Sequence, residues 1–144
     1  MLFFFLTVFT LSAGAGFILS FKSPIGICVD ASGNVYVADS GNHKIRKITP
    51  SGMVSTLAGS GTAGAIDGIA SEASFNNPAG IAIDASGAVY VTDYLNHKIR
   101  KITAAGVVST YAGSGTAGDA DGIGNGALFR NPFGIAIDAS GVMY

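Results

Sequence analysis

The chain repeats itself with a period of 54 residues, and this period limits its possible folds more than any other feature. Pro24, Pro78 and Pro132 each begin a segment of the form P-x-G-I-x-x-D, and the three prolines lie 54 positions apart. When residues 24–68 are laid on residues 78–122, 32 of the 45 aligned positions are identical. Repetition of this kind is typical of propellers, solenoids and other arrays. We therefore divide the chain into a first unit over 21–77, a second over 78–131 and the start of a third over 132–144.

Each unit contains four short runs that have the composition of β-strands. In the second unit these runs are Gly80–Asp84, Val89–Asp93, Lys98–Thr103 and Val107–Ala112. β-Branched and aromatic residues dominate them, and turn residues bound each one. The sequence D-A-S-G, which joins the first run to the second, is typical of a tight turn. Short strands joined by short turns predict a four-stranded antiparallel meander.

The first strand of the second unit is apolar on both of its faces, because Ile81 and Ile83 alternate with Gly80 and Ala82. The whole chain is 49% hydrophobic and only 12% charged, which excludes a disordered protein. Sheets that are apolar on both faces must be covered on both faces. Radial stacking of four-stranded sheets provides this cover, so we expect an all-β fold of propeller blades.

The first twenty residues differ from the repeats. Residues 1–11 form an almost unbroken apolar run, and the small residues of Ala13-Gly14-Ala15 follow it. This order is typical of a secretory signal peptide, although no basic residue precedes the run. The alternatives are a membrane anchor over about 20 residues, or the remnant of a truncated upstream repeat. The first two readings place the protein outside the cytoplasm, as a secreted or extracytoplasmic protein.

The repeated units resemble the NHL repeat. The resemblance rests on the segment G-I-A-I-D-A-S-G-A-V-Y-V-T-D-Y-L-N-H-K-I-R-K-I, with its Asn-His pairs at Asn42-His43 and Asn96-His97. It covers the chain from about residue 21 to residue 144. It implies a propeller, commonly of six blades, with diverse functions that include protein binding, RNA binding and, on related folds, lyase and lactonase activity.

Two complete units and part of a third are fewer than a closed propeller needs, since propellers close with about four to eight blades. We therefore expect an incomplete propeller. Either the chain is a fragment, or several copies associate to close a ring.

Most of the repeated polar residues have a simple structural interpretation. We expect the aspartates of the D-A-S-G turns to cap those turns, and the Asp and Asn of the D-x-x-N-H segments to fix the loop into the third strand. These residues are Asp30, Asp39, Asn42, Asp84, Asp93, Asn96 and Asp138. We expect the basic residues of the K-I-R-K strands to form a solvated outer edge, and the lone Cys28 to be a small buried hydrophobe.

Four residues are candidates for contact with a ligand. Tyr94-Leu95 replaces Ser40-Gly41 in otherwise near-identical repeats, and a difference confined to one loop suggests an exposed, ligand-facing position. His43 and His97 lie beside these positions and complete the set.

The sequence favours a non-catalytic binding or scaffold module that presents loops to a protein, glycan or small ligand. It shows no nucleophile motif, and we expect no catalytic, cofactor or metal residues in it. One alternative is a lyase or lactonase whose metal site lies in other blades. A second is an RNA-binding propeller, but the net charge of −1 makes nucleic acid an unlikely partner. Membrane contact is expected only through an uncleaved N-terminal segment.

Overall fold

The computed structural model of the protein describes residues 20–144. Apart from residue 20, the segment expected to be a signal peptide or anchor lies outside the described residues. Within the described part of the chain, no helix has the length and apolar character needed to cross a membrane.

The first unit forms a four-stranded antiparallel sheet whose strands lie side by side in chain order. The strands are β1 (Pro24–Val29), β2 (Val35–Asp39), β3 (Lys44–Ile48) and β4 (Val54–Ala58). A short 3-10 helix, η1 (Ser40–Asn42), connects β2 to β3. This is the meander that the alternation of short strands and turns predicts.

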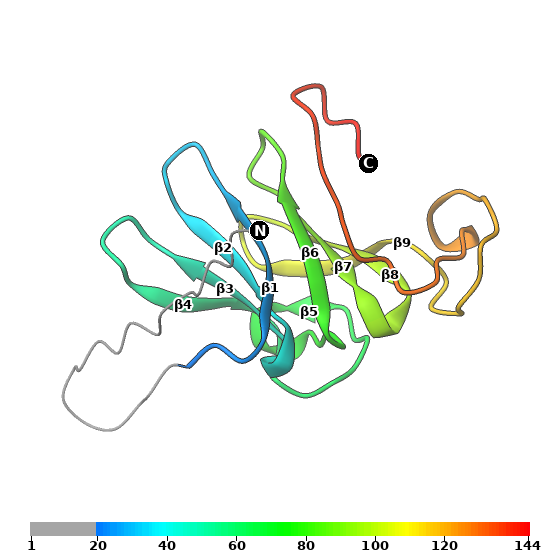
Figure 1. The fold of residues 1–144 in the computed structure, drawn as a ribbon, viewed down its shortest axis with the longest axis horizontal. Helices are drawn as coiled ribbons and strands as arrows, with labels where there is room; N and C mark the ends of the chain where they lie inside the picture. Colours follow the sequence, from blue (N-terminus) through cyan, green and yellow to red (C-terminus); the bar gives the residue numbers. More distant parts are fainter. Residues whose placement is uncertain (1–19) are drawn as a thin grey trace, which may run out of the picture.

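The second unit repeats the same meander in a second sheet. Its strands are β6 (Pro78–Ile83), β7 (Val89–Asp93), β8 (Lys98–Ile102) and β9 (Val107–Ala112), with η3 (Tyr94–Asn96) between β7 and β8. Two further 3-10 turns, η2 (Ala70–Glu72) and η4 (Gly124–Gly126), lie in the long connections that follow β4 and β9. The predicted all-β class with four-stranded antiparallel blades is confirmed, and the sheets do not close into a ring (Figure 1).

One part of the first long connection belongs to the second sheet. Residues 68–69 form a short strand, β5 (Gly68–Ile69), which pairs with β9 as a fifth strand. The division at residue 77 places these residues in the first unit. In the structure these residues belong to the second sheet, because the edge of β9 has backbone hydrogen-bonding groups that pair with β5. The similarity between the repeats does not show this pairing.

The two sheets pack face to face, and the main hydrophobic core lies between them. Tyr36, Ala38 and Ile45 of the first sheet meet Ile81 and Val91 of the second, and all five side chains are buried. Phe75, near the end of the long connection that follows β4, is fully buried in the same cluster. The apolar character of both faces of these strands is explained by this stacking.

The third unit begins as a hairpin-like segment that lies beside β6 on the side away from the first sheet (Figure 1). Ala136 and Tyr144 exchange two backbone hydrogen bonds of 2.9 Å across it. The carbonyl oxygen of Phe133 also accepts a hydrogen bond from Thr92 Oγ1 of β7 at 2.9 Å. The chain therefore occupies three successive blade positions, of which the third is partial.

The loops gather at two opposite ends of the stacked sheets. The D-A-S-G turns lie at one end, where Asp30 Oδ1 accepts hydrogen bonds from the backbone N–H groups of Ser32 and Asn34 at 2.9 and 2.8 Å. The turns that contain η1 and η3 lie at the other end, since they follow the strands that leave the D-A-S-G turns. We call this second end the Asn-His end, because it carries Asn42-His43 and Asn96-His97.

Candidate functional site

The D-x-x-N-H segment of the second unit is built around a buried carboxylate. Asp93 is fully buried and ends β7. Its oxygens accept hydrogen bonds from the backbone N–H of Asn76 at 2.8 Å, from Asn96 Nδ2 at 2.8 Å and from Arg100 Nη1 at 2.7 Å. Burial raises the pKa of Asp93, while these donors act in the opposite direction. The carboxylate therefore holds together three segments of the blade.

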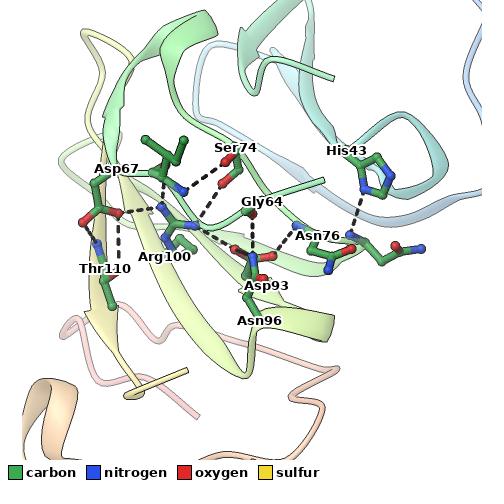
Figure 2. Close-up of polar contacts among 11 residues, drawn as sticks. His43, Gly64, Asp67, Ser74, Asn76, Asp93, Asn96, Arg100 and Thr110 are labelled. Carbon is green, nitrogen blue, oxygen red and sulfur yellow. Dashed lines mark hydrogen bonds and ion pairs between the residues drawn. The ribbon is translucent and has the colours of Figure 1, made fainter. Parts of the chain in front are cut away.

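The guanidinium of Arg100 is the centre of the cluster in Figure 2. Besides Asp93, its Nη2 atom contacts Asp67 Oδ1 at 2.6 Å and donates to the carbonyl of Ile66 at 3.1 Å. Its Nη1 atom donates to the carbonyl of Ser74 at 3.1 Å. Arg100 thereby fixes the long connection, which carries Asp67, Ile66 and Ser74, onto the second sheet.

The prediction that the basic residues of the K-I-R-K strands form a solvated outer edge is wrong for the two arginines of these strands. Arg100 has no exposed surface and Arg46 is 4% exposed. Each lies over an aromatic ring, Arg100 over Phe75 and Arg46 over Phe21. A carboxylate and a ring supplied by neighbouring segments compensate for the burial of the charge, and a sequence pattern read along one strand does not show these partners.

Sequence reasoning missed Asp67. Its carboxylate also accepts hydrogen bonds from the backbone N–H and the hydroxyl of Thr110 on β9, at 3.1 and 3.3 Å. Partial burial acts to raise the pKa of Asp67, but the bonds from Arg100 and Thr110 and the guanidinium charge lower it overall. One signal was present, since the dipeptide Asp67-Gly68 recurs 54 residues later as Asp121-Gly122.

The corresponding cluster of the first unit is looser. Asp39 accepts hydrogen bonds from the backbone N–H of Lys22 at 2.7 Å and from Asn42 Nδ2 at 2.9 Å. Its distance to Arg46 Nη1 is 3.4 Å, compared with 2.7 Å for the Asp93–Arg100 pair. The two units therefore share one design but differ in how tightly the arginine is held.

Each histidine fixes its turn to the last residue of the long connection that leads to the next unit. His43 Nδ1 accepts a hydrogen bond from the backbone N–H of Asn77, and His97 Nδ1 accepts one from Asn131, both at 3.1 Å. Both histidines have left-handed backbones, with φ of 53° and 55°. Each ring is half-buried. Their contact with a ligand stays a prediction, and the structure gives both a connecting role.

Tyr94 and Leu95 lie at the surface of the Asn-His end. Leu95 is 45% exposed, and the half-buried Tyr94 ring makes an edge-to-face contact with Phe133, at 6.0 Å between ring centroids. Phe133 is itself 57% exposed. In the first unit, Lys22 occupies the space beside Gly41 that a side chain would enter, so the first blade has no counterpart of Leu95.

The remaining titratable groups bear on metal binding and on thiol reactivity. This part of the chain contains no group of three or more His, Cys, Asp or Glu side chains placed to hold a metal ion. Cys28 is half-buried, and burial together with the charge of Asp30 raises its thiol pKa to about 12. The thiol is therefore protonated and poorly nucleophilic at neutral pH.

The repeated four-stranded meanders, stacked face to face and containing the same turns in each unit, define a protein of the β-propeller class. A family model described as the NHL repeat matches residues 21–48, and one described as the teneurin NHL domain matches residues 61–121. The chain belongs to the NHL-repeat family.

Similar proteins agree with this assignment. NHL repeat-containing protein 2 of Bos taurus is 39% identical over 123 residues, which are 82% of this chain and 17% of that protein. A protein of unknown function from Bacteroides thetaiotaomicron superposes with a TM-score of 0.71 at 34% identity, over 77% of this chain and 29% of the other. An auxiliary nutrient binding protein of the same bacterium has a TM-score of 0.71 at 27% identity, over 79% and 32%. The chain thus spans less than a third of each of these three proteins.

Proposed function

We propose that this chain is part of a non-catalytic recognition module that binds its ligand at the Asn-His end. The observation that carries the proposal is a contrast within the same loops. The repeated Asp, Asn and His side chains are engaged in bonds inside the protein, whereas the side chains that differ between the units, Tyr94 and Leu95, lie at the surface. Variable side chains on a rigid repeated scaffold are typical of recognition surfaces.

The chemistry of the surface favours a ligand that has an apolar or flat face. Tyr94, Leu95 and Phe133 place two aromatic rings and one aliphatic side chain near one another. Aromatic side chains supply a large contact area at a small cost in conformational entropy, which suits them to the recognition of sugar rings and apolar peptide side chains. The likeness to an auxiliary nutrient binding protein supports a binding role, and an extracytoplasmic location is part of the same proposal.

The burial of the two arginines makes the RNA-binding alternative weaker. Arg46 and Arg100 are two of the six basic residues in the K-I-R-K strands, and their guanidinium groups are engaged in buried contacts. The ammonium groups of Lys47 and Lys101 lie over the rings of Tyr36 and Tyr90. Phosphate binding by these strands would therefore depend on lysines alone.

The proposal is tested by transferring the sequence of the first unit into the second. The double variant Tyr94→Ser, Leu95→Gly carries residues that the same loop already accommodates in the first unit, so we expect it to fold. Wild type and variant are applied to a glycan array and to a displayed peptide library. Met53→Ala, which alters a side chain 63% exposed at the opposite end, serves as the control.

We expect ligands that bind the wild type and the Met53→Ala protein but not the double variant. Equal binding by all three proteins would place the recognition surface elsewhere. Binding of none of the array or library members by the wild type would argue against a recognition role.

A further inference from the structure

A groove lies between the two sheets at the end that carries the D-A-S-G turns, opposite the Asn-His end. Its volume is about 300 Å³, and residues of both units line it, among them Asp30, Lys47 and Leu57 of the first unit and Gly87 and Thr103 of the second. Both walls therefore belong to elements that the structure describes. Ligand sites in proteins have volumes of about 300–1,000 Å³, so the groove has room for a small molecule and not for a macromolecule.

The groove opens because the two sheets touch along their inner strands and separate toward the D-A-S-G turns. A side chain at Gly26 of β1 would overlap the carbonyl oxygen of Ala79 on β6, so the two backbones are in close contact there. A side chain at Gly87, in the turn of the second unit, would meet no atom within 4 Å. Small residues on this wall, Gly87 and Ala104, leave the space open.

The ammonium group of Lys47 supplies the positive charge of the groove. Lys47 is half-buried and lies opposite Tyr36 in the pairing of β2 with β3, with its Nζ atom 5.5 Å from the centroid of the Tyr36 ring. Among residues 20–144 the ion pairs involve only Arg46 and Arg100, so no carboxylate of the described chain forms an ion pair with Lys47. Its N–H donors are therefore available to an anionic group.

The hydroxyl of Ser32 is a second donor in the groove. In the second unit, the equivalent Ser86 donates its hydroxyl to Asp84 at 2.6 Å. Asp30 instead accepts hydrogen bonds from the side chains of Asn34 and Tyr36, and the Ser32 hydroxyl has no hydrogen-bond partner among the described residues. It can therefore donate to a ligand.

The hydroxyl of Thr103 is the donor on the opposite wall. In the first unit, the hydroxyl of Thr49 lies 2.8 Å from the hydroxyl of Ser51. Ala105 replaces this serine in the second unit. The Thr103 oxygen accepts a hydrogen bond from the backbone N–H of Val107 at 3.1 Å, and its own proton is left to donate.

Asp30 carries a negative charge at the groove but offers no acceptor to a ligand. Its carboxylate accepts four hydrogen bonds, from the backbone N–H groups of Ser32 and Asn34, from Asn34 Nδ2 and from the hydroxyl of Tyr36. These bonds, led by that of the Asn34 side chain, lower the pKa of Asp30. A cationic ligand would have to displace them, whereas an anionic ligand leaves them intact.

We propose that this groove binds a small organic molecule that carries a carboxylate group. The carboxylate lies against the ammonium of Lys47, and the hydroxyls of Ser32 and Thr103 donate to oxygens of the ligand. One ammonium balances the single charge of a carboxylate, and the apolar side chains of Leu57 and Val89 favour a carbon skeleton over an inorganic ion. This binding is independent of the recognition surface at the Asn-His end.

The test is a titration of the isotope-labelled full chain with matched pairs of probes, followed through the amide chemical shifts in NMR spectra. The pairs are benzoate with benzamide and glucuronate with glucose, and one member of each pair carries a carboxylate. We expect the carboxylates to shift the amides of Lys47, Gly87 and Thr103 with dissociation constants of about 1 mM, as suits a ligand of about ten non-hydrogen atoms. The neutral members should bind at least about tenfold more weakly.

Two variants separate the charge in the groove from the same charge elsewhere. Lys47→Gln removes the ammonium, and Lys101→Gln is the matched control, because Lys101 lies over the ring of Tyr90 in the second unit at the same 5.5 Å. Lys47→Gln should weaken carboxylate binding at least about tenfold, and Thr103→Val about two- to tenfold. Lys101→Gln should leave it unchanged. Far-UV circular dichroism shows whether each variant keeps the fold of the wild type.

Equal binding of both members of each pair, or equal binding by the wild type and a folded Lys47→Gln protein, would overturn the proposal, because the ammonium would then have no role. Tighter binding of inorganic phosphate than of the carboxylates at the same amides would overturn the assigned class of ligand. Shifts confined to the Asn-His end, or no shifts even at about ten times the expected dissociation constant, would show that the groove is not a carboxylate site.

Discussion

Replacement of Arg100 by methionine provides the sharpest test of how the connection is held to the blade. Arg100 has no exposed surface and contacts the carboxylates of Asp93 at 2.7 Å and Asp67 at 2.6 Å. Methionine has a similar length and fills irregular spaces well, so it removes the charge and the hydrogen bonds while leaving little cavity. The substitution therefore isolates the polar function of the side chain.

The expected loss in the free energy of unfolding follows from the buried carboxylate that the substitution leaves without its cation. Asp93 remains fully buried with two hydrogen-bond donors but without its cation, and breaking a buried ion pair by removing one partner costs about 3–5 kcal/mol. Asp67 adds little to this figure, because its side chain is 50% exposed and water can replace the guanidinium. We expect a loss of about 3–5 kcal/mol, a large part of the ~5–15 kcal/mol that stabilises a typical domain.

The first unit supplies a matched control in Arg46→Met. Arg46 makes two longer contacts, 3.4 Å to Asp39 and 3.4 Å to the carbonyl of Ser55. Asp39 is as buried as Asp93, so this variant also leaves a carboxylate without its cation. The long contacts make the Arg46–Asp39 pair weaker, and we expect a loss at or below about 3 kcal/mol, the lower end of the range given for Arg100→Met. Urea unfolding followed by far-UV circular dichroism gives both losses, since the chain has no tryptophan. All proteins are compared at one concentration, because association changes apparent stability.

An Arg46→Met protein that loses as much free energy of unfolding as the Arg100→Met protein, or more, would refute this explanation. A second check is the double variant Arg100→Met, Asp93→Asn, in which no uncompensated charge is buried. It should be at least about 1 kcal/mol more stable than Arg100→Met alone, since directly contacting residues are energetically coupled. An additive result would show that the orphaned carboxylate is not the source of the loss.

Three further predictions follow from individual contacts. His97→Ala removes the acceptor of the Asn131 N–H and should lower the free energy of unfolding by ~1 kcal/mol. The Asn131 amide should then exchange its hydrogen faster, and unchanged exchange would contradict the role of His97 in holding the connection. Because the pKa of Asp67 is lowered below its usual 3.8, the stability it contributes is present above pH ~4 and is lost as pH falls through the lower folded value. The stability difference between wild type and Asp67→Asn should therefore shrink in urea titrations between about pH 5 and pH 3, and a constant difference would show that the charge has no role. Because burial raises the thiol pKa of Cys28 to about 12, Cys28 should react with iodoacetamide at pH ~8 much more slowly in the folded protein than in urea. Equal rates would show that burial does not protect the thiol.

The strands and turns were predictable because they depend on neighbours in the sequence. The predicted run Val89–Asp93 coincides with β7, and Val107–Ala112 coincides with β9. Alternation of apolar residues and the chemistry of the D-A-S-G turn act over a few residues, so a single unit contains the information that fixes them.

The partners of the buried charges were not predictable in this way. Asp67 lies 33 residues before Arg100 in the chain and reaches it only because the long connection folds back onto the second sheet. A strand read as K-I-R-K shows three basic residues of equal status. Only the packing of the connection distinguishes Arg100, which is buried, from the half-buried lysines on either side of it.

The sequence by itself determined the period, the four strands of each unit, the turns between them and the stacking of apolar faces, since all of these follow from local patterns repeated 54 residues apart. The tertiary structure decided which glycines meet a neighbouring backbone, which arginine is held by two carboxylates, and that residues 68–69 join the second sheet. The physical reason is that contacts between units depend on how one sheet is placed against the next. That placement arises from the packing of whole faces, and no short stretch of the chain encodes it.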